Sequence, residues 1–272
     1  MPNAMPSNPP ALTGHTRLFG IVADPITHVR APQIFNAAFA KRGIDAVMLP
    51  LHVLPKDVPS SFIGFKALAN LDGLVITVPH KFAFAALMDE LGPHARRTQA
   101  VNAIRRNSEG RWVGELFDGV GFVEGLMAHT IDPKGKSFLI YGAGGAGTAI
   151  VSALLAVAPT RITVVDSIAG RAEALCQALG SAALPVETIS NPDPAEFDIV
   201  VNATPMGLEE DDPLPFDPAR MKPDGIVAEV VMMPSMTRLL KVAEQRGLRI
   251  HQGIHMLEGQ FNLMLEFFGL LR

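Results

Sequence analysis

Short apolar runs alternate along this chain with longer segments whose apolar residues recur at helical spacing. The runs that predict strands cover residues 18–22, 46–52, 74–78, 138–141, 162–165, 197–201, 226–231 and 248–251. The helical pattern covers residues 32–43, 55–70, 79–91, 122–129, 148–158, 169–179, 235–246 and 253–270. Residues 101–105 and 111–113 predict a β pair around a turn that contains Asn, Ser and Gly. This alternation is typical of α/β domains.

A glycine-rich turn follows the predicted strand 138–141 and opens the next helix. The turn reads Gly142, Ala143, Gly144, Gly145, Ala146 and Gly147, and the strand after that helix ends on Asp166. In a dinucleotide-binding βαβ unit, such glycines allow a tight turn, close approach to a pyrophosphate and close helix packing, and the acid binds the ribose. The sequence therefore predicts a dinucleotide site. The alternative is a glycine-rich turn in another kind of α/β unit.

Length and composition favour a cytoplasmic protein of two domains. The 272 residues suit two cores, and no apolar run reaches the ~18–20 residues of a membrane span. The net charge of −4, with acids and bases interspersed, predicts neither a nucleic-acid nor a membrane partner. Cys176 is the only cysteine, which excludes an internal disulfide and a cysteine-based metal site. Residues 1–16 have no signal-peptide pattern and predict a disordered tail.

Three polar residues stand where an α/β sheet would bind a ligand. Lys81 follows the C-terminal end of the predicted strand 74–78, in the first turn of a helix. Asn102 opens a strand, and Asp118 opens a helix. Hydride transfer to or from a carbonyl needs a group that moves the hydroxyl proton, and Lys81 paired with Asp118 would supply it. The alternatives are a solvated surface lysine and an aspartate that caps its helix.

The sequence resembles the shikimate and quinate dehydrogenases over nearly all of its predicted ordered part. The segments that carry the resemblance cover residues 24–28, 77–81, 100–103, 118–121, 142–147, 202–207 and 256–260. It implies an α/β substrate domain of residues 17–121 and 255–272, joined to a Rossmann-type dinucleotide-binding domain of residues 122–254. It also implies a cleft between the two domains and a last helix that packs back on the first.

The resemblance assigns roles to individual residues. It places catalysis on Lys81 and Asp118. It implies that the substrate is bound by Thr77, Asn102 and Gln260, and His28 beside the expected cleft is a further candidate. It implies that the cofactor is bound by the turn 142–147 together with Asp166, Ser167, Arg171, Asn202, Ala203, Thr204, Met206 and Val230. His80 could also contact the substrate or serve only the structure.

The residues expected to bind the substrate depart from the family pattern. Where the family has two hydroxyl side chains for the substrate carboxylate, this chain has Val29 and Ala31. Arg30 between them could replace the hydroxyls through a charge-assisted contact, or it could point to solvent. Leu116 and Phe117 replace an Asn-Thr pair before the expected catalytic aspartate. We therefore expect a more apolar substrate site and weakened binding of shikimate.

The cofactor preference also departs from the family. Its biosynthetic members usually carry an arginine after the second strand, which grips the 2′-phosphate of NADP. Here Asp166 and Ser167 stand at this point, and a carboxylate would repel that phosphate. We expect NAD rather than NADP, although Arg171 is close enough in sequence to reach the phosphate.

Two histidines have the spacing of a metal pair. His251 and His255 lie four residues apart. Gly253 between them and the lack of a recognisable third ligand argue against a metal site, so we expect none.

The sequence thus predicts an NAD(P)-linked oxidoreductase that interconverts a 3-dehydroshikimate-type ketone and a shikimate-type alcohol. One alternative is a dehydrogenase of quinate or another hydroxy acid. Another is a non-catalytic nucleotide sensor, against which the Lys81/Asp118 pair argues. We expect a monomer or a homodimer.

Overall fold

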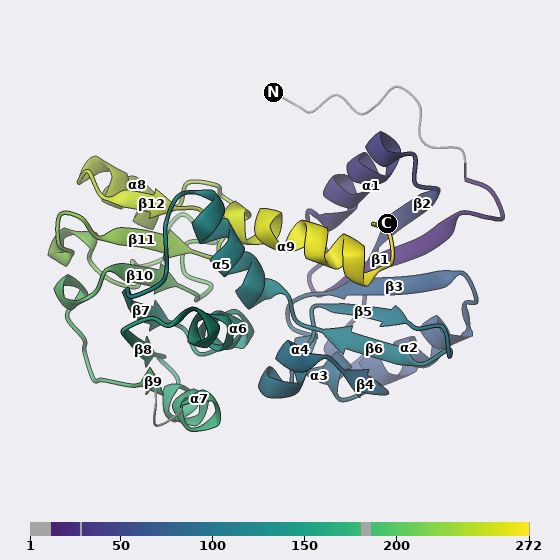
Figure 1. The fold of residues 1–272 in the computed structure, drawn as a ribbon, viewed down its shortest axis with the longest axis horizontal. Helices are drawn as coiled ribbons and strands as arrows, with labels where there is room; N and C mark the ends of the chain where they lie inside the picture. Colours follow the sequence, from purple (N-terminus) through teal and green to yellow (C-terminus); the bar gives the residue numbers. More distant parts are fainter. Residues whose placement is uncertain (1–11, 28, 181–185, 272) are drawn as a thin grey trace. The chain divides into compact units, whose positions relative to one another are not determined.

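The computed structural model describes residues 12–27, 29–180 and 186–271, which form two compact units (Figure 1). The first unit contains the described residues up to Glu90 together with Asn102–Gly114. The second contains Leu91–Val101 and the chain from Glu115 onward. Among the described residues, no helix has both the length and the apolar character needed to cross a membrane.

The first unit is built on a mixed sheet. Its strand order is β2-β1-β3-β5-β6-β4. The strands are β1 (Arg17–Ala23), β2 (Ala46–His52), β3 (Leu71–Ile76), β4 (Glu90–Leu91), β5 (Ala103–Arg106) and β6 (Trp112–Glu115). Strand β1 pairs in parallel with β2 and β3, whereas β3 and β5 are antiparallel. The helices are α1 (Ala31–Arg42), the 3-10 turn η1 (Pro55–Asp57), α2 (Val58–Ala67) and α3 (Lys81–Ala85).

The second unit is built on a fully parallel sheet. Its strands are β7 (Ser137–Tyr141), β8 (Arg161–Val165), β9 (Val186–Glu187), β10 (Ile199–Asn202), β11 (Ile226–Glu229) and β12 (Arg249–His251). Their order is β12-β11-β10-β7-β8-β9, which is the strand order of a Rossmann fold. The order reverses between β7 and β10, so a ligand is expected at the carboxyl ends of these two strands. The predicted α/β fold with a Rossmann-type domain is confirmed.

Helices cover both faces of this parallel sheet. The helices of this unit are α4 (Pro93–Thr98), α5 (Asp118–Ala128), α6 (Gly145–Leu154), α7 (Arg171–Leu179), α8 (Arg238–Gln245) and α9 (Ile254–Phe267), with short 3-10 turns η2 (Leu155–Val157), η3 (Pro194–Glu196) and η4 (Pro218–Arg220). Phe138 and Ile140 of β7 pack in the core with α5, α6 and α7, whereas Leu139 packs in the core with α8. Successive side chains of a strand point to opposite faces, which explains why β7 is apolar throughout.

Helix α9 packs on α5 through glycines. A side chain on Gly121 would place its Cβ 2.5 Å from the carbonyl oxygen of Met256, and one on Gly259 would meet the carbonyl oxygen of Gly121 at 2.2 Å. This close contact is why α9 groups with the second unit, whereas the sequence had assigned residues 255–272 to the substrate domain. The predicted boundaries of a substrate domain and a cofactor domain stay a prediction.

The predicted helix 79–91 is much shorter than expected. Helix α3 ends at Ala85, and a turn, β4 and α4 follow it. The backbone N–H of Asp89 donates to the carbonyl of Trp112 (3.0 Å), and the Asp89 carboxylate accepts from the N–H of Trp112 (2.7 Å). These bonds pull the chain to β6, and Pro93 then holds Gly92 in an extended conformation. A contact with a distant strand thus overrides the local helical pattern.

Candidate functional site

The glycine loop connects β7 to α6 in the geometry that a dinucleotide requires. Gly142 has φ +107°, and a Cβ there would lie 2.7 Å from the carbonyl oxygen of Ala203. A Cβ on Gly147 would lie 1.8 Å from the carbonyl oxygen of Gly142, so only glycine lets α6 approach the loop this closely. A Cβ on Gly144 would meet no described atom within 4 Å. The space in front of Gly144 is therefore open to a ligand.

The first turn of α6 faces this open space. Gly144 is the N-cap residue, and no side chain among the described residues caps the helix there. The N-terminus of a helix has unpaired N–H groups and a partial positive charge, and both favour a phosphate. The loop 142–147 thus fits the pyrophosphate of a dinucleotide. Gly145 and Ala146 open the helix and would present their N–H groups to that ligand.

Asp166 is fixed against the glycine loop. One carboxylate oxygen accepts from the backbone N–H of Ala143 (2.7 Å), and the other accepts from that of Ile168 (2.8 Å). Asp166 lines a pocket of about 230 Å³ beside β8 and α7, with Ile168, Ala172 and Glu173 among its other walls. Ser167 and Arg171 are exposed close by. This arrangement fits the sugar and base of a nucleotide whose phosphates lie at the loop.

A second loop at the switch point follows β10. The buried Asn202 donates from its amide to the carbonyl of Met206 (2.8 Å) and accepts from the backbone N–H and hydroxyl of Thr204 at 3.1 and 2.6 Å. The backbone N–H of Ala203 donates to Tyr141 (2.7 Å), and that of Val230 donates to Asn202 (3.0 Å). The structure therefore brings these predicted cofactor residues together at the carboxyl ends of β7, β10 and β11.

Glu229 is a buried acid that the sequence analysis missed. It ends β11 with its side chain fully buried, and it accepts a hydrogen bond from the hydroxyl of Thr237 (3.0 Å), which also caps α8. Burial raises the pKa of Glu229 from 4.5 to about 7, although the hydrogen bonds from Thr237 and Asn202 act in the opposite direction. The sequence feature that could have revealed Glu229 is a single acid inside the apolar run 226–231.

In the first unit, three predicted site residues converge at one end of β3. Thr77 follows this strand and is half-buried, and its backbone N–H donates to the carbonyl of Val22 (3.1 Å). The carbonyl of Asn102 accepts from the N–H of Ile76 (2.8 Å), which places the buried Asn102 beside the same strand end. Lys81 begins α3 with 9% of its surface exposed. It is therefore not the solvated surface lysine of the alternative reading.

The segment before α1 carries the expected apolar substitutions. Val29 is half-buried and Ala31 is buried, whereas Arg30 is exposed. Arg30 stands at the N-cap of α1 without a side-chain capping bond. His28, the further candidate for a substrate contact, lies outside the described residues. His80 is buried, and its burial lowers the pKa of the imidazole below its usual value.

In the second unit, Asp118 and Gln260 form a buried polar pair. Each exposes 4% of its surface, and the Gln260 amide donates to the Asp118 carboxylate at 3.5 Å. Phe117, not Asp118, is the N-cap of α5, so the capping alternative for Asp118 is wrong. Leu116 is buried, and Phe117 contacts Phe267 edge to face at 5.4 Å between ring centroids. The polar pair thus lies beside apolar neighbours.

Comparisons with known proteins agree with this geometry. Residues 21–104 match the family described as shikimate dehydrogenase substrate binding domain. A shikimate dehydrogenase (NADP(+)) of Rubrobacter xylanophilus is 35% identical over 91% of this chain and 89% of that protein.

Two solved structures resemble the whole chain. A shikimate 5-dehydrogenase from Listeria monocytogenes, in complex with shikimate and NAD, is 32% identical with a TM-score of 0.86, over 95% of this chain and 93% of that one. A 5-ketofructose reductase of Gluconobacter is 27% identical with a TM-score of 0.84, over 94% of each chain.

We predict that Glu229→Gln changes the pH dependence of stability. The pKa of Glu229 is raised to about 7 in the folded state. Its favourable contribution to the free energy of unfolding is therefore complete below about pH 4.5 and is lost as the pH rises through 7. Glutamine stays neutral and can still accept from Thr237. The variant should match the wild type near pH 4.5 and be more stable at pH 8, by up to about 3 kcal/mol.

Urea unfolding at a series of pH values measures this difference. Glu244→Gln, on the exposed side of α8, is the matched control and should change stability little at any pH. A Glu229→Gln effect of constant size across the pH range would contradict the prediction.

Proposed function

This chain belongs to the shikimate dehydrogenase family of oxidoreductases, which use a nicotinamide dinucleotide, and from that premise we propose its reaction and its site. It reversibly transfers a hydride between the cofactor and a small polyhydroxylated ring, interconverting a 3-dehydroshikimate-type ketone and a shikimate-type alcohol. The observation that supports this best is the burial of Lys81, a residue that exposes only 9% of its surface at the start of α3. Lysine is almost never buried at this level without a role for its charge.

Lys81 is assigned the proton transfer. The bound nicotinamide supplies the position that accepts or returns the hydride. During oxidation the alcohol must also lose its hydroxyl proton, and the amine of Lys81 accepts it. During reduction the ammonium returns that proton to the carbonyl oxygen. Asp118 is assigned the role of the partner carboxylate in this proton transfer.

Thr77, Asn102 and Gln260 are assigned to the hydroxyl groups of the substrate. Their hydroxyl and amide groups both donate and accept, which matches the two-way hydrogen bonding of an alcohol. Asn102 and Gln260 are buried, and Thr77 is half-buried, so each would bind the ring away from bulk water. His28 and Arg30 remain proposed substrate contacts, with Arg30 in place of the hydroxyl groups that are missing at Val29 and Ala31.

A second candidate substrate is a polyhydroxylated ketone without a carboxylate. The observation that favours it is the loss of hydroxyl donors at Val29 and Ala31, the second of which is buried. The Gluconobacter relative is named for a keto sugar, and a sugar carries no carboxylate. Quinate or another hydroxy acid is a third substrate to test. The oligomeric state (monomer or homodimer) and the cytoplasmic location stay predictions.

NAD is the proposed cofactor, although the relative from Rubrobacter is named for NADP(+). Asp166 supports this choice, because two backbone N–H groups fix its carboxylate just after β8. Asp166 and Ile168 line the same pocket. A negative charge held there repels a 2′-phosphate and accepts a hydrogen bond from a free 2′-hydroxyl. Arg171 at the start of α7 is the residue that would act against this preference.

We predict that Lys81→Met abolishes most turnover. Methionine keeps the length and the burial of the side chain but cannot move a proton. The kcat should fall by about 10²–10⁴-fold, the usual contribution of a general acid–base group. The affinity for the dinucleotide should not change, because the glycine loop belongs to the other unit.

Absorbance at the nicotinamide band, with shikimate and then quinate, measures the turnover. Lys56→Met, an exposed lysine in the same unit, is the control and should turn over like the wild type. Unchanged kcat in Lys81→Met would remove the lysine from the mechanism.

We predict that the double variant Val29→Ser/Ala31→Ser binds shikimate more tightly. Hydrogen bonds to a charged group are worth ~1.5–3 kcal/mol each, so the KM for shikimate should fall on the order of tenfold or more. The kcat should change little, because the proton-transfer residues are intact. Ala40→Ser, at an exposed position of α1, is the control.

The same assay with fructose, the reduced partner of 5-ketofructose, separates the two substrate classes. If the wild type oxidises fructose well and shikimate poorly, the neutral substrate is favoured. If it already has a low KM for shikimate and the added hydroxyls do not lower it, the carboxylate is bound by other residues and this prediction fails.

We predict that Asp166→Asn reduces discrimination between the two dinucleotides. The wild type should have the higher kcat/KM with NAD. Removing the charge should lower the NAD-to-NADP ratio of kcat/KM about tenfold or more, because the repulsion of the 2′-phosphate disappears. Any damage to the loop affects both cofactors, so the ratio isolates the charge.

Glu173→Gln is the matched control, since it removes another carboxylate from the same pocket. It should change the ratio less than Asp166→Asn does. A wild type that prefers NADP would refute the proposed cofactor choice.

A further inference from the structure

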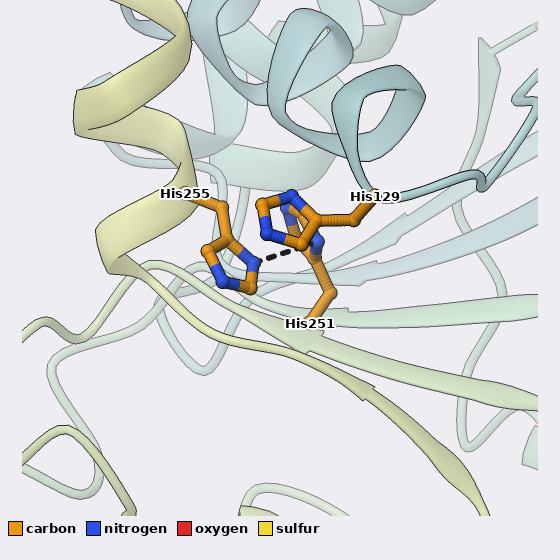
Figure 2. Close-up of side chains that lie close together, drawn as sticks. All are labelled: His129, His251 and His255. Atoms are coloured by element: carbon orange, nitrogen blue, oxygen red, sulfur yellow. Dashed lines mark hydrogen bonds between the residues drawn. The ribbon is translucent and has the colours of Figure 1, made fainter.

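In the second unit, His129 meets two histidines that lie more than 120 residues later in the chain, His251 and His255. His129 is the C-cap of α5, His251 ends β12, and His255 lies in the first turn of α9. Each offers one ring nitrogen, and these nitrogens all lie within 4.8 Å of one another. Figure 2 shows the three imidazoles close together, with His251 behind His129 and a hydrogen bond between His255 and His251. The sequence had argued against a metal site for lack of a third ligand, and His129 provides one.

The two closest nitrogens have a separation that suits a shared ion. Nδ1 of His255 lies 3.1 Å from Nδ1 of His251. Two nitrogens that bind one tetrahedral ion at ~2.0–2.1 Å lie about 3.3–3.4 Å apart. Without an ion, one of the two must donate a proton to the other. With an ion, both present a lone pair to it after a shift of a few tenths of an ångström.

His129 is held in the tautomer that a metal ligand needs. Its Nδ1 lies 3.0 Å from the carbonyl oxygen of Gly125, and a carbonyl can only accept, so Nδ1 carries the proton. The other ring nitrogen, Nε2, therefore has the free lone pair. Metal-binding histidines commonly donate their second N–H to a backbone carbonyl in this way. The ring stacks on His255 at 3.6 Å between centroids, and its exposed position leaves it room to swing toward the ion.

Packing alone does not account for His251. Its side chain is fully buried, and its Nε2 has no hydrogen-bond partner among the described residues. Phe122 contacts the ring edge to face at 5.6 Å and fixes its orientation. Buried side-chain polar atoms nearly always have a hydrogen-bond partner, so hydrogen bonding and packing alone do not explain a histidine at this position.

We propose that His129, His251 and His255 form a binding site for one divalent transition-metal ion, with Zn²⁺ as the ion of choice. Imidazole nitrogen suits zinc, and three histidines leave a fourth position for water. The exposed ring of His129 gives the ion a path from solvent. The ion would join the end of α5 to β12 and to the start of α9, and so stabilise the second unit. It has no part in hydride transfer.

The charges around the cluster moderate the affinity. Arg249 donates to the carbonyl of Thr130 (3.3 Å) and to its hydroxyl (2.8 Å), so a guanidinium lies near the ligands. It also donates to the carbonyl of His129. The ligands of the proposed site are all neutral imidazoles, so its affinity for an ion depends on the three ring nitrogens.

The test uses the full chain, stripped of metal with a chelator and dialysed. Titration with Co²⁺ alone should produce visible absorption bands of a four-coordinate ion, saturating at one ion per chain, and Zn²⁺ should displace it. His129→Asn and His255→Asn should each weaken Co²⁺ binding at least tenfold, since each removes one of three ligands. Zn²⁺ should raise the Tm of the wild type and leave the Tm of both variants unchanged.

Two controls separate this site from other effects. His15→Asn removes an exposed histidine of the other unit and should bind Co²⁺ like the wild type. His129→Asn should keep the dehydrogenase activity of the wild type. His251 is buried and its variant can fail to fold, so the result is decided by His129→Asn and His255→Asn. The proposal is overturned if the wild type shows no saturable Co²⁺ bands, or if both variants bind as tightly as the wild type.

Discussion

The close approach of backbones at glycines sets the arrangement of the second unit. Helix α6 can reach the dinucleotide loop because Gly147 has no side chain. Helix α5 can approach α6 because Gly119 has no side chain. A Cβ there would lie 1.9 Å from the carbonyl oxygen of Ala149. Helix α9 can reach α5 through Gly121 and Gly125. Helices usually pack with axes 8–10 Å apart, and small residues at the contact allow the shorter distances. The sheet, the loop and the last helix thus depend on one series of glycine contacts.

This packing explains which polar groups meet. Gly121 lets α9 lie against the first turn of α5, and there Gln260 reaches Asp118 at 3.5 Å. Gly125, one turn further along α5, would meet the carbonyl oxygen of His255 at 2.6 Å if it carried a Cβ. The same helix pair therefore holds a buried acid and amide near one end and the histidine cluster near the other. A larger residue at either glycine would move both groups of side chains at once.

The sequence was sufficient for the Rossmann unit because its signals are local. The apolar runs, the glycine turn and Asp166 lie within one βαβ segment, and the strand order follows from the family of folds that this segment specifies. Features that depend on distant contacts were not predictable. The helix expected over 79–91 is cut short by Asp89 pairing with Trp112, and His129 meets His255 only through the packing of α5 on α9. Glu229 was hidden for another reason, since an acid inside an apolar run reveals neither its burial nor its partner Thr237.

In the proposed reaction, the residues assigned to proton transfer differ from those expected to determine the substrate. Lys81 and Asp118, to which we assign the proton transfer, are each buried, and that role would not discriminate one secondary alcohol from another. Discrimination depends on groups that bind the remainder of the ring, and at Val29, Ala31 and Leu116 these positions are apolar. Without hydrogen-bond donors at these positions, a substrate carboxylate would lose binding energy unless other polar groups contacted it. A neutral substrate would not have this loss. The proposed chemistry could thus be retained with a different substrate, because the apolar positions lie outside the residues assigned to proton transfer.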